Sequence, residues 1–180
     1  MEYLILFLPL LASIISGFFG KLIGDRISQT ITSLFVSVSA LFSLVVFYKV
    51  ATTGYENNLI IATWINSGSL NVNWSINIDA LSSVMLVVVT VVSSLVHIYS
   101  IGYMSNDPHK SRFMSYLSLF TFAMLTLVTS DNFIQLFFGW EGVGLCSYFL
   151  IGFWFKKPSA NAAAIKAFLV NRVGDFGFAL

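Results

Sequence analysis

Five long apolar runs constrain this chain more than any other feature of its sequence. Each has about the 20 residues that an α-helix needs to cross roughly 30 Å of hydrocarbon. Lipid offers the backbone no hydrogen-bond partner, so a run of this length must satisfy its own N–H and C=O groups as a helix. We therefore predict membrane-spanning helices at 3–23, 28–50, 80–102, 113–130 and 132–154.

A sixth apolar segment begins near Ala162 and is still running at Leu180. No capping residue, flanking charge or polar tail closes it. We therefore expect a truncated sixth span, in a chain that is a fragment of a longer protein. The fold predicted for residues 1–180 is a single all-α membrane domain, a multi-pass transmembrane helical bundle.

The composition agrees with a membrane protein. Charged residues make up 9% of the chain and apolar residues 57%, whereas soluble domains are about 25% charged. With a formal net charge of +1, no basic cluster is large enough to bind nucleic acid. The single cysteine, Cys146, has no intramolecular disulfide partner and is expected to be a buried, inert thiol. Glu2 stands where a cleavable signal peptide is basic, so the first run is expected to be retained.

Basic residues gather on one side of the predicted spans. Because Lys and Arg favour the cytoplasmic or matrix side, their distribution predicts an N-terminus that faces outward. The opposite side holds only Lys49. The first, third and fifth connections hold Lys21, Arg26, Lys110, Arg112, Lys156 and Lys157.

The only long connection, 51–79, lies on the predicted outer side and is rich in Asn, Ser and Trp. Apolar and polar residues alternate from Leu70 to Trp74, which is typical of a strand, so we expect a short β-hairpin on the membrane surface. Asp79 is placed to cap the third helix. Asp131 leaves almost no loop between the fourth and fifth spans, which makes those helices antiparallel neighbours.

Glu141 is the residue most informative about function. It lies on the order of 15 Å inside the end of the fifth span at Asp131, close to the membrane midplane. A carboxylate at that depth costs at least about 2.5 kcal/mol and usually marks an ion or proton pathway. A fixed, hydrogen-bonded structural acid is the alternative. Gly139, Gly142 and Gly144 surround it and allow either close helix packing or room for water.

His97 lies in a polar stripe on one face of the third span. Hydroxyl groups in membrane helices often bond to their own backbone or hold helices together. His97 adds a group that titrates near neutral pH in its unperturbed state, so both a structural stripe and a proton pathway remain open. The other members are Ser83, Thr90, Ser93, Ser94 and Ser100.

The sixth segment carries three charged side chains. Arg172 and Asp175 are three residues apart and are expected to pair along the helix, with Asn171 placed to support Asp175. The pair is either structural or acts on Glu141, if the two helices touch. Lys166 lies nearer the inner surface, where a lysine can extend its ammonium group into water.

The sequence contains no phosphate-binding glycine loop, no Cys/His metal spacing and no nucleophile triad. We therefore expect no redox cofactor and no metal on this chain.

Three stretches resemble a known family. They are DALS at 79–82 with VHIYSIGYM at 96–104, FGWEGVGLCSYFLIGFW at 138–154, and NRVGD at 171–175. They are similar to the antiporter-like subunit called chain 5, or subunit L in bacteria, of respiratory complex I, the proton-pumping NADH:quinone oxidoreductase. The family usually has Gly where this chain has Ala80. The resemblance covers essentially the whole chain.

The resemblance implies roles for individual residues. Glu141 corresponds to the family's fifth-helix glutamate, which pairs with a lysine on a later helix and gates proton transfer. Arg172 and Asp175 correspond to its charged neighbours, and His97 belongs to the polar third helix. Family members are longer, with two inverted repeats, broken helices and a lateral helix. Alone, a fragment without the partner lysine is not expected to move protons.

The resemblance also implies partners and a location. NADH, FMN, iron–sulfur clusters and quinone would be bound by other subunits, and this chain would contact other membrane subunits, including related antiporter-like ones, and lipid. The membrane would be the bacterial inner membrane or the mitochondrial inner membrane. Two alternatives remain: the large subunit of a multisubunit Na⁺/H⁺ antiporter, which shares the Trp-Glu pair at Trp140 and Glu141, and a passive structural scaffold.

Overall fold

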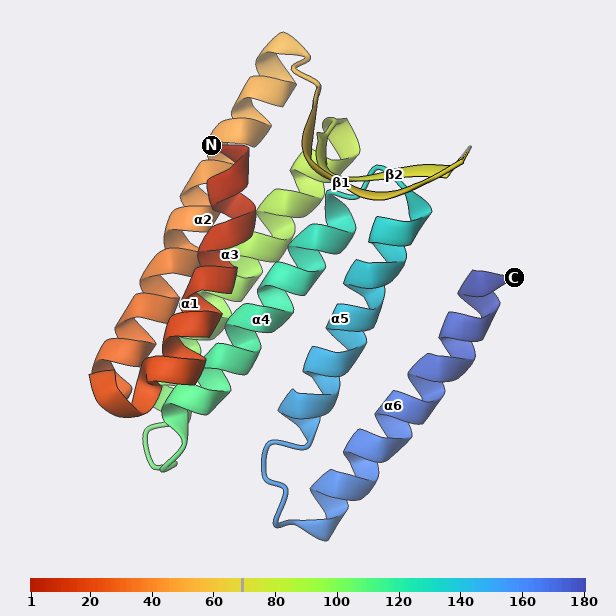
Figure 1. The fold of residues 1–180 in the computed structure, drawn as a ribbon. Coiled ribbons are helices and arrows are strands. Elements are labelled where there is room, and N and C mark those ends of the chain that lie inside the picture. The colour runs from red at the N-terminus through yellow and green to blue at the C-terminus, as the bar shows by residue number, and fades with distance from the viewer. Residues whose placement is uncertain (69) are drawn as a thin grey trace.

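The computed structural model describes residues 1–68 and 70–180, apart from the side chain of residue 179. Helices dominate these residues, and a single hairpin interrupts them (Figure 1). In chain order the elements are α1 (Glu2–Ile23), α2 (Asp25–Thr53), β1 (Asn57–Ser67), β2 (Leu70–Ile78), α3 (Ala80–Tyr103), α4 (Lys110–Val128), α5 (Phe133–Ile151) and α6 (Pro158–Ala179).

Among the described residues, five helices, α1 to α5, are long and apolar enough to cross a membrane. The helix α6 has comparable length, at 22 residues. Its charged residues Lys166, Arg172 and Asp175 fall close together and lower its apolar character. The predicted multi-pass helical bundle is therefore confirmed, with α6 as its most polar member.

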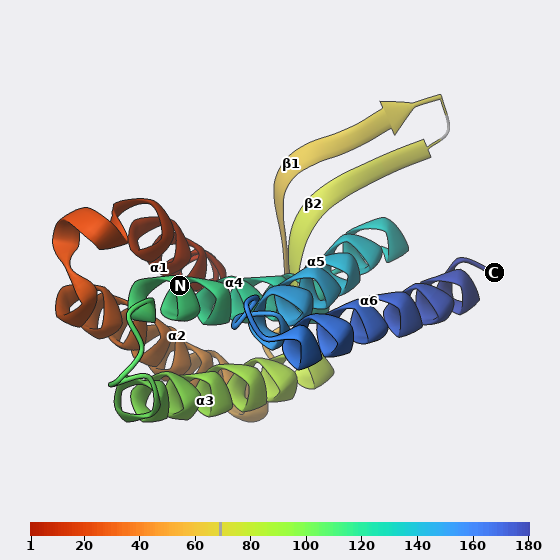
Figure 2. The same ribbon diagram turned by 90° about the horizontal axis from the view of Figure 1, so that it is seen from below.

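The helix α4 lies at the centre of the packing, against α1, α2, α3 and α5. In turn, α6 packs against α5 at the side of the bundle (Figure 2). Gly139 explains the close approach of α5 to α4, since a Cβ there would lie 2.7 Å from Leu127 Cα. Gly142 faces the same helix, with Ala123 Cβ 3.1 Å from the position of an added Cβ. These two glycines therefore serve helix packing.

The short turn between α4 and α5 is closed by Asn132, whose side chain accepts a hydrogen bond of 2.8 Å from the backbone N–H of Gln135. The cap satisfies one of the N–H groups that a helix start leaves free. Asp79 caps α3 in the same way: its carboxylate accepts from the Ser82 N–H at 2.7 Å, and the Ser82 hydroxyl accepts from the Asp79 N–H at 2.8 Å. The predicted cap at Asp79 is confirmed.

The strands β1 and β2 form an antiparallel hairpin within the segment where alternation predicted strands. The hairpin lies at the same end of the bundle as the N-terminus, and its tip projects beyond the helices (Figures 1 and 2). Val72, Ile76 and Ile78 of β2 are buried, and the last two join an apolar cluster with Ile5 and Leu125. Burial of one face fixes the register of β2 on the bundle.

The hairpin also anchors the start of α5. The buried Gln135 side chain donates to the Ser75 carbonyl at 2.7 Å and accepts from the Ser75 N–H at 2.9 Å, as a neighbouring strand does. One turn further along α5, the Phe138 ring packs edge-on against Trp74, with centroids 4.9 Å apart. These contacts hold the first half of α5, which leads directly to Glu141.

Candidate functional site

Glu141 and Arg172 form an ion pair that joins α5 to α6. The Arg172 Nη1 lies 2.5 Å from Glu141 Oε1 and 2.6 Å from Oε2. The same nitrogen lies 3.1 Å from Asp175 Oδ2. One guanidinium nitrogen is therefore shared by two carboxylates, one on each helix. With both acids ionised, the group carries one more negative charge than positive charge.

Asp175 is the fixed end of this group. Its side chain is buried, and its second oxygen, Oδ1, accepts a 2.8 Å hydrogen bond from Trp140 Nε1. Trp140 directly precedes Glu141 on α5, so two consecutive residues of α5 contact the charged pair on α6. The predicted pairing of Arg172 with Asp175 is confirmed. The sequence left open whether the two helices touch, and the ion pair of Arg172 with Glu141 shows that they do.

The contact of Trp140 with Asp175 was not predicted from the sequence. The signal was present, because a tryptophan indole N–H placed in an apolar environment usually finds a hydrogen-bond partner. A tryptophan next to an intramembrane acid is a natural donor to another carboxylate. What the sequence did not contain was the direction in which the indole points.

Asn171 lies elsewhere than expected. It was predicted to support Asp175, but the structure places its side-chain amide against Gly144, where any added Cβ would overlap the amide nitrogen. Of the two alternatives for this glycine, close packing and room for water, the structure shows close packing, because Asn171 occupies the space beside Gly144. The glycine allows α6 to approach α5 one turn beyond Glu141. The physical reason is packing, since a side chain at residue 144 would push the helices apart.

The charged group is open on one side within the described residues. The Arg172 side chain is 48% exposed and the Glu141 side chain 24% exposed. The Phe168 ring packs against the guanidinium, with its centroid 4.8 Å from the central carbon. Lys166 is also exposed and forms no salt bridge in the part of the chain that the structure describes.

His97 forms a second cluster, completely buried between α3 and α4. Its Nδ1 lies 2.7 Å from the Ser93 carbonyl oxygen, and its Nε2 lies 3.0 Å from Ser118 Oγ. A carbonyl oxygen only accepts, so Nδ1 must carry a proton and donate it. In the neutral ring, Nε2 then accepts from the Ser118 hydroxyl. If the ring gains a proton, Nε2 donates and the hydroxyl must turn to accept.

The polar stripe of α3 is divided between two neighbouring helices. Thr90 and Ser94 pair with hydroxyls of α2, at 2.7 and 2.8 Å. Ser93 and His97 face hydroxyls of α4 instead. Among the described residues no hydrogen bond joins this cluster to Glu141, so the structure brings together Glu141, Arg172 and Asp175 but not His97 or Lys166.

Comparison with known proteins gives a consistent result. Two family models match: "NADH-Ubiquinone oxidoreductase (complex I), chain 5 N-terminus" over residues 64–114, and "NADH:quinone oxidoreductase/Mrp antiporter, TM" over residues 130–180. The chain is 58% identical to NADH-ubiquinone oxidoreductase chain 5 of Chondrus crispus over 180 residues. It is 57% identical to NADH-quinone oxidoreductase subunit L of Rickettsia conorii. The chain belongs to the chain 5/subunit L family. It covers 27% of the length of each of these two relatives.

The fold has a solved counterpart in an archaeal respiratory membrane complex, the membrane-bound sulfane sulfur reductase. The TM-score is 0.80 at 19% sequence identity, and the match covers 97% of this chain and 34% of that one. At this identity the likeness concerns the fold alone. The antiporter-like architecture predicted from the sequence is confirmed by this fold and by the second family model.

Proposed function

We propose that this chain forms part of a proton-translocating membrane subunit of NADH:quinone oxidoreductase, in which Glu141 gains and loses the proton. The observation that supports this most strongly is the sharing of Arg172 between Glu141 and Asp175. A purely structural pair needs one acid and one base. Here a second carboxylate competes for the same guanidinium nitrogen.

The competition gives the site a physical means of control. An arginine stays charged at every physiological pH, so its position decides which carboxylate is stabilised as an anion. While Arg172 contacts Glu141, the ionised form of Glu141 is favoured. If Arg172 moves toward Asp175, which Trp140 holds in place, Glu141 loses its cation and takes up a proton. A small side-chain movement thereby changes the proton occupancy of Glu141.

His97 is proposed as a second proton-accepting group, because its Nε2 and the Ser118 hydroxyl can exchange donor and acceptor roles without breaking their contact. Lys166 is proposed only as a positive charge on the exposed face of α6. We place the N-terminus and the hairpin outside and the six basic loop residues at the opposite end, on the cytoplasmic or matrix side. The membrane is a bacterial inner membrane or a mitochondrial inner membrane.

NADH, FMN, iron–sulfur clusters and quinone are assigned to other subunits of the complex, together with the electron transfer that drives pumping. The first family match favours this assignment over the large subunit of a Na⁺/H⁺ antiporter, because it describes chain 5 of complex I. The second match covers both classes. Copurification separates them, since only the oxidoreductase carries flavin and iron–sulfur proteins.

The test uses the full-length parent complex in inverted membrane vesicles. Glu141→Gln keeps the size of the side chain and removes its exchangeable charge. We expect normal complex abundance with a sharp loss of NADH-driven acidification and of coupled turnover. Glu56→Gln, an exposed acid in the loop before β1, is the matched control. Unchanged pumping per NADH in Glu141→Gln would mean a passive scaffold.

A further inference from the structure

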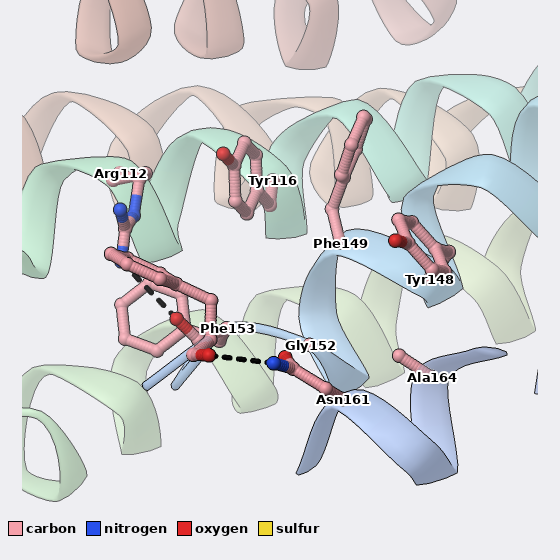
Figure 3. Close-up of a pocket in the computed structure, with 9 residues that line it drawn as sticks. Arg112, Tyr116, Tyr148, Phe149, Gly152, Phe153, Asn161 and Ala164 are labelled. Atoms are coloured by element: carbon pink, nitrogen blue, oxygen red, sulfur yellow. Dashed lines mark hydrogen bonds between the residues drawn. The ribbon is translucent and has the colours of Figure 1, made fainter. Parts of the chain in front are cut away.

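A pocket opens where α4 begins, α5 ends and α6 begins, at the end of the bundle opposite the hairpin (Figure 3). Its volume is about 220 Å³. We call it the Arg112 pocket. Its walls include Arg112 and Tyr116 of α4, Tyr148 and Phe149 of α5, Phe153 of the following turn, and Asn161 of α6. No residue proposed above to carry a proton lines it.

The Arg112 guanidinium has few hydrogen-bond partners for a charged group in a partly buried pocket. Its Nη2 donates to the Phe153 carbonyl at 3.2 Å, and its Nε is buried without any hydrogen-bond partner. Phe153 and Phe155 cover the guanidinium, with ring centroids 4.7 and 5.4 Å from its central carbon. In the described part of the chain no carboxylate lies within salt-bridge distance of Arg112. A guanidinium has several N–H donors, and most are unused here.

Asp107, the acid nearest to Arg112 in sequence, is hydrogen-bonded to other groups. Asp107 accepts from Trp154 Nε1 at 2.9 Å and from the His109 N–H at 2.8 Å. Although desolvation raises the pKa of Asp107, these hydrogen bonds and the neighbouring charges of His109 and Arg112 bring that pKa below its ordinary value. The carboxylate is therefore ionised but held by other donors. An anion from outside the chain would satisfy the unused donors of Arg112.

The surroundings favour the phosphate group of a lipid. The basic loop residues Lys156 and Lys157 follow the pocket wall in sequence and add positive charge at this end. The same end of the helices is where a bilayer places its headgroups, and arginine binds phosphate oxygens well. The stacked rings of Tyr116 and Phe149, with centroids 5.2 Å apart, give the pocket an apolar wall on the bundle side. Such a wall suits the glycerol and upper acyl chain of a phospholipid rather than a fully hydrated ion.

We propose that the Arg112 pocket binds an anionic phospholipid, with its phosphate on Arg112 and its upper acyl chain against Tyr116 and Phe149. Free inorganic phosphate presents the same chemical group, and the experiment separates the two sources. The site lies apart from the charged group of Glu141 and does not depend on how protons move. It fixes the loop between α5 and α6 to the membrane surface.

The test measures lipid binding to the purified full-length complex after detergent exchange, by native mass spectrometry with added phosphatidylglycerol. Arg112→Gln is expected to weaken binding at this site about tenfold, which is the loss of one charge-assisted contact. Arg112→Lys is expected to recover part of it. Lys21→Gln removes one charge from the end of α1 without lining the pocket and is expected to bind as the parent does. Equal loss in Lys21→Gln and Arg112→Gln would leave only a general surface charge effect and overturn the site.

A second measurement needs no variant. A phosphatidylglycerol with a photoreactive group near the glycerol is expected to label the parent complex at the end of α5, within 145–155. Labelling confined to other segments would overturn the proposal. Protection by millimolar inorganic phosphate as strong as that by unlabelled lipid would identify a soluble anion site and overturn the lipid assignment.

Discussion

Two helix interfaces in this chain are built from polar groups, and they differ in kind. The α1–α4 interface is closed by reciprocal hydrogen bonds: the Ser13 hydroxyl donates to the Ser115 carbonyl at 2.9 Å, and the Ser115 hydroxyl donates to the Ser13 carbonyl at 2.8 Å. The α5–α6 interface is held by Arg172, shared between Glu141 and Asp175. In the first interface each of these serine hydroxyls donates to a carbonyl of the other helix. In the second, one guanidinium nitrogen contacts three carboxylate oxygens.

The difference shows how a membrane bundle can combine rigidity with change. Neutral hydroxyls bonded to carbonyls have one good arrangement, so α1 to α4 form a fixed frame. A cation between two anions can pair more closely with either one, and in the function proposed above the protonation of Glu141 decides which. On that proposal the frame is polar for packing, whereas the site is polar for proton transfer. The predictions below separate the two.

The largest structural effect is expected where α5 packs against α4, at Gly139. Gly139→Ala places a Cβ 2.7 Å from the Leu127 backbone, and overpacking of this kind costs about 1–3 kcal/mol. We expect reduced assembly and a lower melting temperature of the complex. Gly174→Ala is the matched control, because nothing lies within 4 Å of its added Cβ, and it should leave the melting temperature nearly unchanged. An equal change in melting temperature for both variants would show that the change in helix propensity, and not close packing at Gly139, determines the effect.

The largest functional effect after loss of Glu141 is expected for Arg172→Gln. Breaking a fully buried ion pair costs about 3–5 kcal/mol, and the 48% exposure of Arg172 makes the loss smaller here. Without the cation that Glu141 and Asp175 share, coupled NADH oxidation in vesicles is expected to fall at least about tenfold, which corresponds to a loss of about 1.4 kcal/mol. Arg172→Lys keeps the charge but not the geometry and should recover part of the rate. If coupled NADH oxidation in Arg172→Gln equals that of the parent, Arg172 is not the cation that controls the proton on Glu141.

A smaller effect is expected for Trp140→Phe. It removes the indole hydrogen bond to Asp175, and a hydrogen bond to a charged group contributes about 1.5–3 kcal/mol. Asp175 then competes more strongly for Arg172, so acidification per NADH should fall by a few-fold. Trp154→Phe, which removes an indole contact in a loop, is the control. Acidification per NADH at equal complex abundance distinguishes the two variants.

The smallest effect is expected for Ser118→Ala, which removes the hydroxyl that faces His97 Nε2. The change in stability should be about 1 kcal/mol, with a fall of a few-fold in coupled turnover if His97 exchanges protons as proposed. Ser43→Ala removes a hydroxyl from the α2–α3 pair with Thr90 and should change stability alone. Identical pumping in both variants would assign His97 to the frame.

Sequence alone predicted the helices because apolar length and capping residues are local. The fourth helix was placed slightly too late, at 113–130, whereas the structure has Lys110–Val128. The fifth was predicted at 132–154 and so extends past the end of the observed helix, Phe133–Ile151. Hydropathy finds the apolar window, but a helix begins and ends where its backbone hydrogen bonds do. The basic start of α4 extends beyond its apolar part, and the turn at Gly152 stops α5 before Phe153.

The candidate site was predictable only where it depends on residues close together in the sequence. The spacing of Arg172 and Asp175 fixes their pairing within one helix. The contact of Arg172 with Glu141 depends on how α6 packs on α5, which no single-helix pattern specifies. The position of Asn171 against Gly144 and the bond from Trp140 are also tertiary. Their side-chain directions follow from packing between helices and not from either sequence segment.

The most direct test of the shared arginine is infrared difference spectroscopy of the full-length complex, before and after NADH is added. A protonated carboxylic acid absorbs in a region free of amide bands. We predict a carboxylic acid band that changes on energisation, disappears in Glu141→Gln and changes in intensity in Trp140→Phe. A spectrum in which Glu141→Gln keeps the same band, or in which no carboxylic acid changes, would contradict the proposal that Glu141 takes up and releases the proton.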